Sequence, residues 1–209
     1  MMYLIGLTGN IACGKSTVVA MLAERGAAVI DADTVTHALQ QPGQPVYTQI
    51  VAAFGPGILA APAGPIDRRK LGAIVFSDPA ALERLEAIVH PAVRARLAAW
   101  IQEQERQAEH TSQGTPHAAL VAVIDAIKLL ESGWKARCDA IWVVTCAVEQ
   151  QTTRLMATRG MSEQEARVRI AAQPPQADKI AQAAVVIDNS GTLDETVRQV
   201  DAAWAALVR

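Results

Sequence analysis

Five short runs of apolar residues divide the chain, and each run is continuous rather than alternating. They cover residues 3–7, 28–30, 119–124, 140–145 and 184–187. Continuous runs that are rich in Val and Ile are typical of strands buried on both faces of a parallel sheet. The pattern predicts an α/β fold with a five-stranded parallel sheet.

Helical patterns fill the segments between these runs. Residues 16–25 direct Val18, Val19, Met21 and Leu22 inward, and Gly26 follows as a stop signal. Strand, loop, helix and strand within the first thirty residues predict a βαβ unit with a right-handed crossover.

The second and third runs are separated by about ninety residues with mostly helical patterns, far more than a simple connection needs. Pro79 predicts a helix start, and Pro91 is expected to bend or break that helix on its way toward His110. Residues 110–117 are expected to form a polar surface loop. The insert either binds a second substrate or stabilises the fold without a ligand.

A second, smaller insert lies before the last run. Ser162 and Glu165 fit a capping box that opens a helix. Residues 154–179 carry a charge of +2, which leaves −4 for the rest of the chain (Arg154, Arg159, Arg167, Arg169 and Lys179 against Glu163, Glu165 and Asp178). This excess favours a lid that closes over phosphates, although a solvated helix face would carry the same residues.

The segment GNIACGKST, residues 9–17, directly follows the first run and fits G-x-x-x-x-G-K-[ST]. Glycines let backbone N–H groups approach phosphate oxygens, and the helix dipole adds positive potential. Lys15 supplies a cation for the outer phosphates and Ser16 a hydroxyl for magnesium. The segment predicts nucleoside triphosphate binding. A glycine-rich turn without a ligand would leave Lys15 unexplained.

The pattern of acidic residues separates the classes of phosphate-loop proteins. A GTPase needs N/T-K-x-D to read guanine, and no K-x-D occurs in the chain, so D-x-x-G at residues 188–191 is interpreted as a strand-to-loop junction. Asp31 and Asp33 follow the second run, at the edge where ligands of parallel sheets gather. Asp33 is the candidate general base, with Asp31 in support. Capping of the next helix is the competing role for Asp33.

Asp125 follows the third run and is a candidate magnesium ligand through water. Structural burial is the competing interpretation for this carboxylate.

Composition narrows the setting. The 209 residues are 51% hydrophobic and 19% charged, which is typical of a globular protein with one elaborated α/β domain or two small ones. A net charge of −2 favours neither nucleic acid nor an anionic membrane as partner. The longest apolar run, 118–124, is too short to span a bilayer.

Three cysteines without metal-ligand spacing indicate a reducing compartment, so we expect a cytoplasmic protein. Cys13 lies inside the phosphate loop. It is interpreted as a small filler, with redox sensing as the alternative.

Several blocks together resemble one family. GLTGNIACGKST, GAAVIDADTVTHAL, FGPGIL, IDRRKL, LEAIVHPAV, LLESGW, RGMSEQEA and VVIDNSG follow in order, and the chain is similar to the dephospho-coenzyme A kinases over nearly its whole length. The resemblance implies ATP-dependent, magnesium-assisted phosphorylation of the ribose 3′-hydroxyl of dephospho-coenzyme A, the last step of coenzyme A synthesis. It also implies a three-layer phosphate-loop kinase fold, with ATP and dephospho-coenzyme A as the partners.

The resemblance implies roles for individual residues. The catalytic residues are Asp33, Lys15 and Arg159. The ATP site comprises Asn10, Ile11, Ala12, Cys13, Gly14, Lys15, Ser16, Thr17, Arg159 and Asn189. The acceptor site comprises Thr8, Asp33, His37, Arg69 and His90. For His37 and His90, a surface histidine and a partner of the Pro91 kink are the plainer interpretations.

The same resemblance divides the chain into a core of residues 1–37, 117–150 and 181–209, a helical acceptor-binding insert of residues 38–116 and a lid of residues 151–180. Asn10, Ala12 and Cys13 depart from the smaller or more flexible residues usual in the family. Two other functions remain open: a kinase of another small acceptor, such as a nucleoside monophosphate, and a nucleotide-binding regulator without catalysis.

Overall fold

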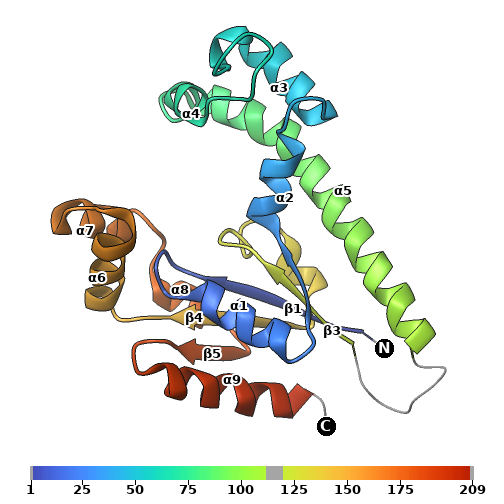
Figure 1. The fold of residues 1–209 in the computed structure, drawn as a ribbon, viewed down its shortest axis with the longest axis vertical. Helices are drawn as coiled ribbons and strands as arrows, with labels where there is room; N and C mark the ends of the chain where they lie inside the picture. Colours follow the sequence, from blue (N-terminus) through green and yellow to red (C-terminus); the bar gives the residue numbers. More distant parts are fainter. Residues whose placement is uncertain (1, 112–119, 208–209) are drawn as a thin grey trace. The chain divides into compact units, whose positions relative to one another are not determined.

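The computed structural model describes residues 2–111 and 120–207 of the chain (Figure 1). The chain forms two compact units. One combines Met1–Ile30 with Gln104–Arg209 and the other is Asp31–Glu103. They are described separately below.

The first unit contains a five-stranded parallel sheet, as predicted. Its strands are β1 (Met2–Gly9), β2 (Ala28–Asp31), β3 (Leu120–Asp125), β4 (Ala140–Thr145) and β5 (Val185–Asp188), in the order β2-β3-β1-β4-β5. The predicted strands lie within one or two residues of these bounds, and residue 119 lies outside the described residues. Because β3 lies between β1 and β2, the crossover from β1 to β2 passes over a strand added later in the sequence.

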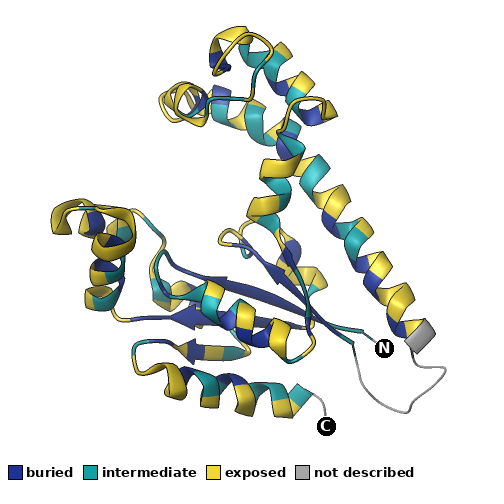
Figure 2. Cartoon of the chain, viewed as in Figure 1, coloured by how far each residue is buried: buried dark blue, intermediate teal, exposed yellow. Residues whose placement is uncertain are grey.

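Burial differs between the centre and the edges of the sheet. β1, β3 and β4 are buried over most of their length, as continuous apolar runs predict. The prediction of burial on both faces is wrong for β2 and β5, which keep exposed residues because an edge strand has one neighbour (Figure 2). The phosphate-loop strand β1 therefore lies at the most enclosed position.

Helices cover both faces of the sheet, so the unit has three layers with the sheet in the middle. On one face α1 (Lys15–Glu24) and α9 (Leu193–Leu207) bury Leu22 and Val200 against Ile5, Leu7 and Trp142. Val18 and Met21 of α1 are also buried, and the predicted Val19 is partly buried. On the other face lie η2 (Trp134–Arg137) and α8 (Gln176–Ile180), which contact β1 and β4.

Residues 148–180, which include the predicted lid segment of residues 151–180, form a helical hairpin followed by a short helix. α6 (Val148–Arg159) ends at Gly160 in the left-handed region, with φ 63°, and contacts α7 (Glu163–Ala171). The predicted capping box is confirmed, because the Ser162 hydroxyl accepts from the Glu165 N–H and the Glu165 carboxylate accepts from the Ser162 N–H.

The second unit is helical. Its elements are α2 (Ala32–Leu39), α3 (Pro45–Phe54), η1 (Pro56–Ile58), α4 (Arg68–Val75) and most of α5 (Pro79–Thr111). Ile50, Ile58 and Leu71 are centres of its core. The insert is thus a packed body with a core of its own.

Helix α5 begins at Pro79, as predicted, and continues through Pro91 as one helix. Of the bend or break expected at Pro91, the break is absent, and residues on both sides remain buried, Val89 before it and Leu97 after it; the bend stays a prediction. The predicted loop of residues 110–117 begins inside this helix, which reaches Thr111, and residues 112–117 lie outside the described residues. Among the described helices, none is both long and apolar enough to cross a membrane.

Candidate active site

The phosphate loop connects β1 to α1, and two of its glycines are required by packing. A Cβ on Gly9 would lie 2.6 Å from the Val144 carbonyl oxygen. Gly14 caps α1 with φ 82°, and a Cβ there would lie 1.9 Å from Asn189 Nδ2. The loop is therefore pressed against neighbouring strands and loops, in addition to presenting its amides to a ligand.

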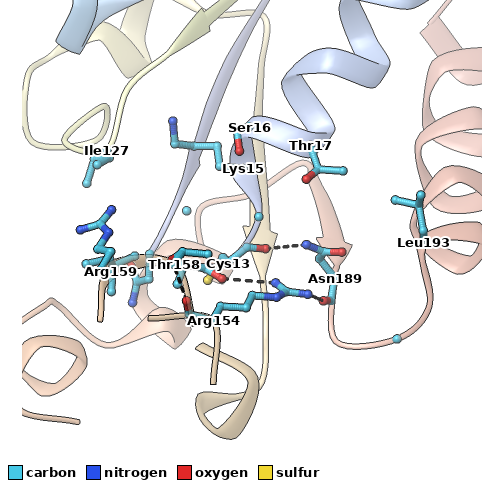
Figure 3. Close-up of a pocket in the computed structure, with 16 residues that line it drawn as sticks. Cys13, Lys15, Ser16, Thr17, Ile127, Arg154, Thr158, Arg159, Asn189 and Leu193 are labelled. Atoms are coloured by element: carbon cyan, nitrogen blue, oxygen red, sulfur yellow. Dashed lines mark hydrogen bonds between the residues drawn. The ribbon is translucent and has the colours of Figure 1, made fainter. Parts of the chain in front are cut away.

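A cavity of about 530 Å³ opens over this loop, within the size range of small-molecule sites (Figure 3). It is lined by residues 9–17 together with Ile127, Arg154, Thr158, Arg159, Asn189, Gly191 and Leu193. The cavity contains every residue that the sequence assigned to ATP, from Asn10 to Thr17 with Arg159 and Asn189.

Lys15 forms an ion pair with Asp125, the last residue of β3. Asp125 is opposite Leu7 in the sheet register, which brings it beside the loop that follows β1. Its side chain is largely buried, so the lysine neutralises a carboxylate that would otherwise be costly to bury. Ser16 is exposed in the first turn of α1.

Arg154 of α6 is a site residue that the analysis of the sequence placed only in the basic lid. Its guanidinium donates to the Ala12 carbonyl at 3.2 Å, to the Asn189 carbonyl at 2.9 Å and to Cys146 Sγ at 3.4 Å. These bonds join the phosphate loop, the residue after β4 and the loop after β5; Figure 3 shows Arg154 between the phosphate loop and Asn189. The signal in the sequence was weak, because nothing distinguished Arg154 from the other four basic residues of the segment 154–179.

Asn189, whose carbonyl accepts from Arg154, also braces the phosphate loop. Its Nδ2 donates to the Cys13 carbonyl at 2.8 Å, and its Oδ1 accepts from the Thr196 hydroxyl at 2.9 Å. The residue is 6% exposed. Both ends of the amide are thus used within the protein, and Figure 3 shows the side chain directed at the loop.

Arg159 differs in its surroundings from Arg154 and Arg167 of the same segment. It lies in the last turn of α6, is exposed, lines the cavity and forms no ion pair with any residue that the structure describes. Arg167, in contrast, pairs with Glu163 one turn away on α7. Arg159 is therefore available to an anionic ligand at the loop.

Thr8 and Lys179 converge on the carbonyl of Ile127. The Thr8 hydroxyl donates to it at 3.0 Å and Lys179 Nζ at 3.1 Å. Thr8 is fully buried, so contact with an acceptor would require this bond to open. Lys179 is 3% exposed, and burial lowers its pKa. Two residues far apart in the chain thereby fix the segment after Asp125.

Cys13 is fully buried, and burial raises the pKa of its thiol to about 12. A buried neutral thiol is a poor nucleophile and a poor target for oxidants. These properties support the interpretation of Cys13 as a filler over the alternative of a redox sensor.

The second unit carries four of the five residues assigned to the acceptor, and the fifth, Thr8, belongs to the first unit. Asp31 caps α2, since its Oδ1 accepts from the Asp33 N–H at 2.7 Å and the Thr34 N–H at 3.0 Å. The competing role of Asp33 as the cap is therefore wrong, and its exposed carboxylate lies in the first turn of α2. His37 follows one turn later on the same face and is also exposed.

Arg69 and His90 lie on other helices of this unit. Arg69 is exposed in the first turn of α4, where Asp67 accepts from its N–H at 2.9 Å, and His90 is exposed on α5. Among the described residues, no hydrogen bond or ion pair joins Asp33, His37, Arg69 and His90 to one another. Their side chains are available to a ligand individually.

In chemical terms, the first unit offers a cavity with loop amides, the cations Lys15 and Arg159, and the exposed hydroxyl of Ser16. This set is suited to a polyphosphate and its counter-ion. Among the described residues, no group of three or more His, Cys, Asp or Glu side chains could hold a metal by itself. Magnesium keeps several waters and needs few protein ligands, so Ser16 and Asp125 fit its requirements.

Comparisons with known proteins identify what this chain is similar to. The family model described as "Dephospho-CoA kinase" matches residues 3–195. The "Dephospho-CoA kinase" of Symbiobacterium thermophilum is 51% identical over 205 residues, which are 98% of this chain and 81% of that protein. The protein of the same name from Geobacter sulfurreducens is 48% identical over 98% of both chains.

A solved structure agrees in fold. A crystal structure of a protein from Thermus thermophilus matches with a TM-score of 0.81 and 32% identity, and it covers 100% of this chain and 99% of its own. The similarity thus extends over both units.

Proposed function

Because this chain belongs to the dephospho-CoA kinase family, we propose that it transfers the γ-phosphoryl group of ATP to the ribose 3′-hydroxyl of dephospho-coenzyme A, giving coenzyme A and ADP. The observation that carries the proposal is the cavity over the phosphate loop, with Lys15 and Arg159 at its wall. Phosphoryl transfer depends mainly on positioning and on charge stabilisation, and both are available here.

In the proposed reaction, the loop amides and Lys15 hold the β- and γ-phosphates. Lys15 is paired with Asp125 before ATP binds, so phosphate oxygens compete with that carboxylate for the ammonium group. Arg159 neutralises charge on the migrating phosphoryl group, and closure of the segment 151–180 excludes water that would otherwise hydrolyse ATP.

Magnesium belongs to the proposal as the counter-ion of ATP. Ser16 would hold it through the hydroxyl, with Asp125 acting through water, and it would neutralise charge between the β- and γ-phosphates. Asn10 to Thr17, with Asn189 as a brace, make up the rest of the proposed ATP site.

Asp33 is the proposed general base, which orients the acceptor hydroxyl and accepts its proton. Its exposed position in the first turn of α2 leaves the carboxylate available, because Asp31 already caps the helix. We place Thr8, His37, Arg69 and His90 with Asp33 in the acceptor site. The insert is the proposed acceptor-binding part and residues 151–180 the proposed lid.

A coupled ADP-release assay tests the function. ADP should appear with ATP, magnesium and dephospho-coenzyme A, and not without the acceptor. Nucleoside monophosphates should be poor acceptors, and a preference for one of them would overturn the proposed substrate.

Two matched variants test Asp33. Asp33→Asn should keep ATP binding and lose about 100-fold or more in kcat, the usual contribution of a general base. Asp31→Asn retains a good capping residue and should lose far less. Equal turnover of the two variants would remove Asp33 from the role.

We also propose a reducing, cytoplasmic setting, since Cys13, Cys138 and Cys146 are free thiols.

A further inference from the structure

The connection between α7 and α8 is hydrogen-bonded to the first half of the phosphate loop. Gln173 Oε1 accepts from the Ile11 N–H at 2.7 Å. Next to it, Asn10 Nδ2 donates to the Pro174 carbonyl at 3.2 Å. Two adjacent residues of the loop thus hold two adjacent residues of the lid segment, which fixes both the distance and the orientation between them.

A third residue extends this contact along the loop. Gln176 Oε1 lies 3.4 Å from Cys13 Sγ and 3.4 Å from the Cys146 N–H. We call Gln173, Pro174 and Gln176 the latch. All three belong to the same compact unit as the phosphate loop, and they follow it by more than 150 residues in the chain.

The sequence makes the latch stiff. Pro174 and Pro175 fix their own φ angles, and each restricts the residue before it. Pro175 also occupies the N-cap position of α8. A displacement at the C-terminal end of α7 is therefore transmitted to Gln173 rather than absorbed by a flexible loop.

The other end of α7 has a different character. Gly160 ends α6 in a left-handed conformation, and a Cβ there would meet nothing within 4 Å. Helix α7 is consequently connected through an uncrowded glycine at its start and through the latch at its end. Any movement of α7 is communicated to the phosphate loop at Ile11.

We propose that Gln173 is a positioning residue for phosphoryl transfer, which holds the Ile11 amide and couples the geometry of the phosphate loop to the position of the lid helix α7. The inference rests on the proposed function for its kinetic effect. The hydrogen bond that carries it belongs to the protein without ligands.

Hydrogen exchange of the full chain tests the bond without any acceptor. In Gln173→Ala the Ile11 amide should exchange at least about tenfold faster than in the wild type, while Gln173→Glu keeps an oxygen acceptor and should retain protection. Equal exchange of the Ile11 amide in the wild type and in Gln173→Ala would overturn the latch, whether or not the protein phosphorylates dephospho-coenzyme A.

Kinetics test the positioning role. Gln173→Ala should lower kcat about tenfold, which corresponds to about 1.4 kcal/mol, and change KM for ATP by less than about threefold. Gln173→Glu should recover kcat and raise KM for ATP, because its charge repels the phosphates. Normal kcat in Gln173→Ala, or no recovery of kcat in Gln173→Glu, would reduce Gln173 to a structural residue.

Gln164→Ala supplies the matched control. Gln164 is an exposed glutamine of the same helix, α7, without a hydrogen bond to the loop. Wild-type exchange and kinetics in this variant support the proposal, and a loss equal to that of Gln173→Ala would contradict it. If Gln173→Ala fails to fold, Gln173→Glu and its KM for ATP still separate the two roles.

Discussion

Asn189 should stabilise the empty phosphate loop and not act solely as a nucleotide contact. Asn189→Ala removes the donor to the Cys13 carbonyl and the acceptor for the Thr196 hydroxyl. The hydroxyl keeps a second acceptor, the Thr192 carbonyl at 3.2 Å, whereas the loop carbonyl loses its amide partner in a buried place. The loss should therefore fall mainly on the loop.

The magnitude follows from the cost of leaving a buried polar group unpaired, about 1–3 kcal/mol, together with the lost packing of a side chain that is 6% exposed. We expect a decrease of about 2–3 kcal/mol in the free energy of unfolding. For a chain of this size, that lowers Tm by about 4–12 °C. The unbraced loop should also raise the Kd for ATP about tenfold.

Thermal unfolding without nucleotide, followed by calorimetric titration with ATP, measures both effects. Asn189→Asp has the same shape but places an oxygen opposite the Cys13 carbonyl, so it should be at least as destabilising as the alanine variant. Thr196→Val removes only the hydroxyl at the other end of the amide and should cost about 1 kcal/mol. A wild-type Tm in Asn189→Ala, with weakened ATP binding, would refute the bracing role and leave Asn189 as a nucleotide contact.

Two further predictions concern the same loop. Ala12 has φ 58°, so Ala12→Gly should relieve backbone strain and stabilise the protein by up to about 1 kcal/mol. Ala63→Gly, at φ 56° in the other unit, should stabilise the protein in the same way. A change in ATP affinity in Ala63→Gly would contradict a local origin of the strain relief. The pKa of Cys13 is raised from 9.0 to about 12, so the folded thiol contributes stability below pH 9 that is lost as pH rises toward 12. Denaturant titrations from pH 8 to 11 should show a fall that is smaller in Cys13→Ala, and identical slopes would exclude this cause.

The sheet and the phosphate loop could be predicted because their signals are local. An apolar run shows its burial by its own composition, and G-x-x-x-x-G-K-S is contiguous. The residues that shape the loop could not be predicted in the same way. Arg154 and Gln173 contact residues of the loop that lie more than a hundred positions away in the chain. Thr196 acts through Asn189, which contacts the loop, and none of the three residues belongs to a recognisable motif.

Pro91 shows the opposite case, in which a strong local signal is overridden. Proline removes one helical hydrogen bond, but buried residues on both sides keep α5 in one piece. Asp31 and Asp33 illustrate a third limit. Either carboxylate could cap α2 by its spacing, and only the hydrogen bonds distinguish the cap from the free acid.

The positions of the loop's partners along the chain have a consequence for folding during synthesis. The phosphate loop is synthesised more than a hundred residues before the side chains that hydrogen-bond to it, Arg154, Gln173 and Asn189. At a synthesis rate of about 5–20 residues per second, these side chains are made on the order of ten seconds or more after the loop. Its strand β1 likewise has no sheet neighbours until β3 and β4 have been made. The chain therefore acquires a supported nucleotide-binding loop only after these later segments have been made, although the motif itself precedes them.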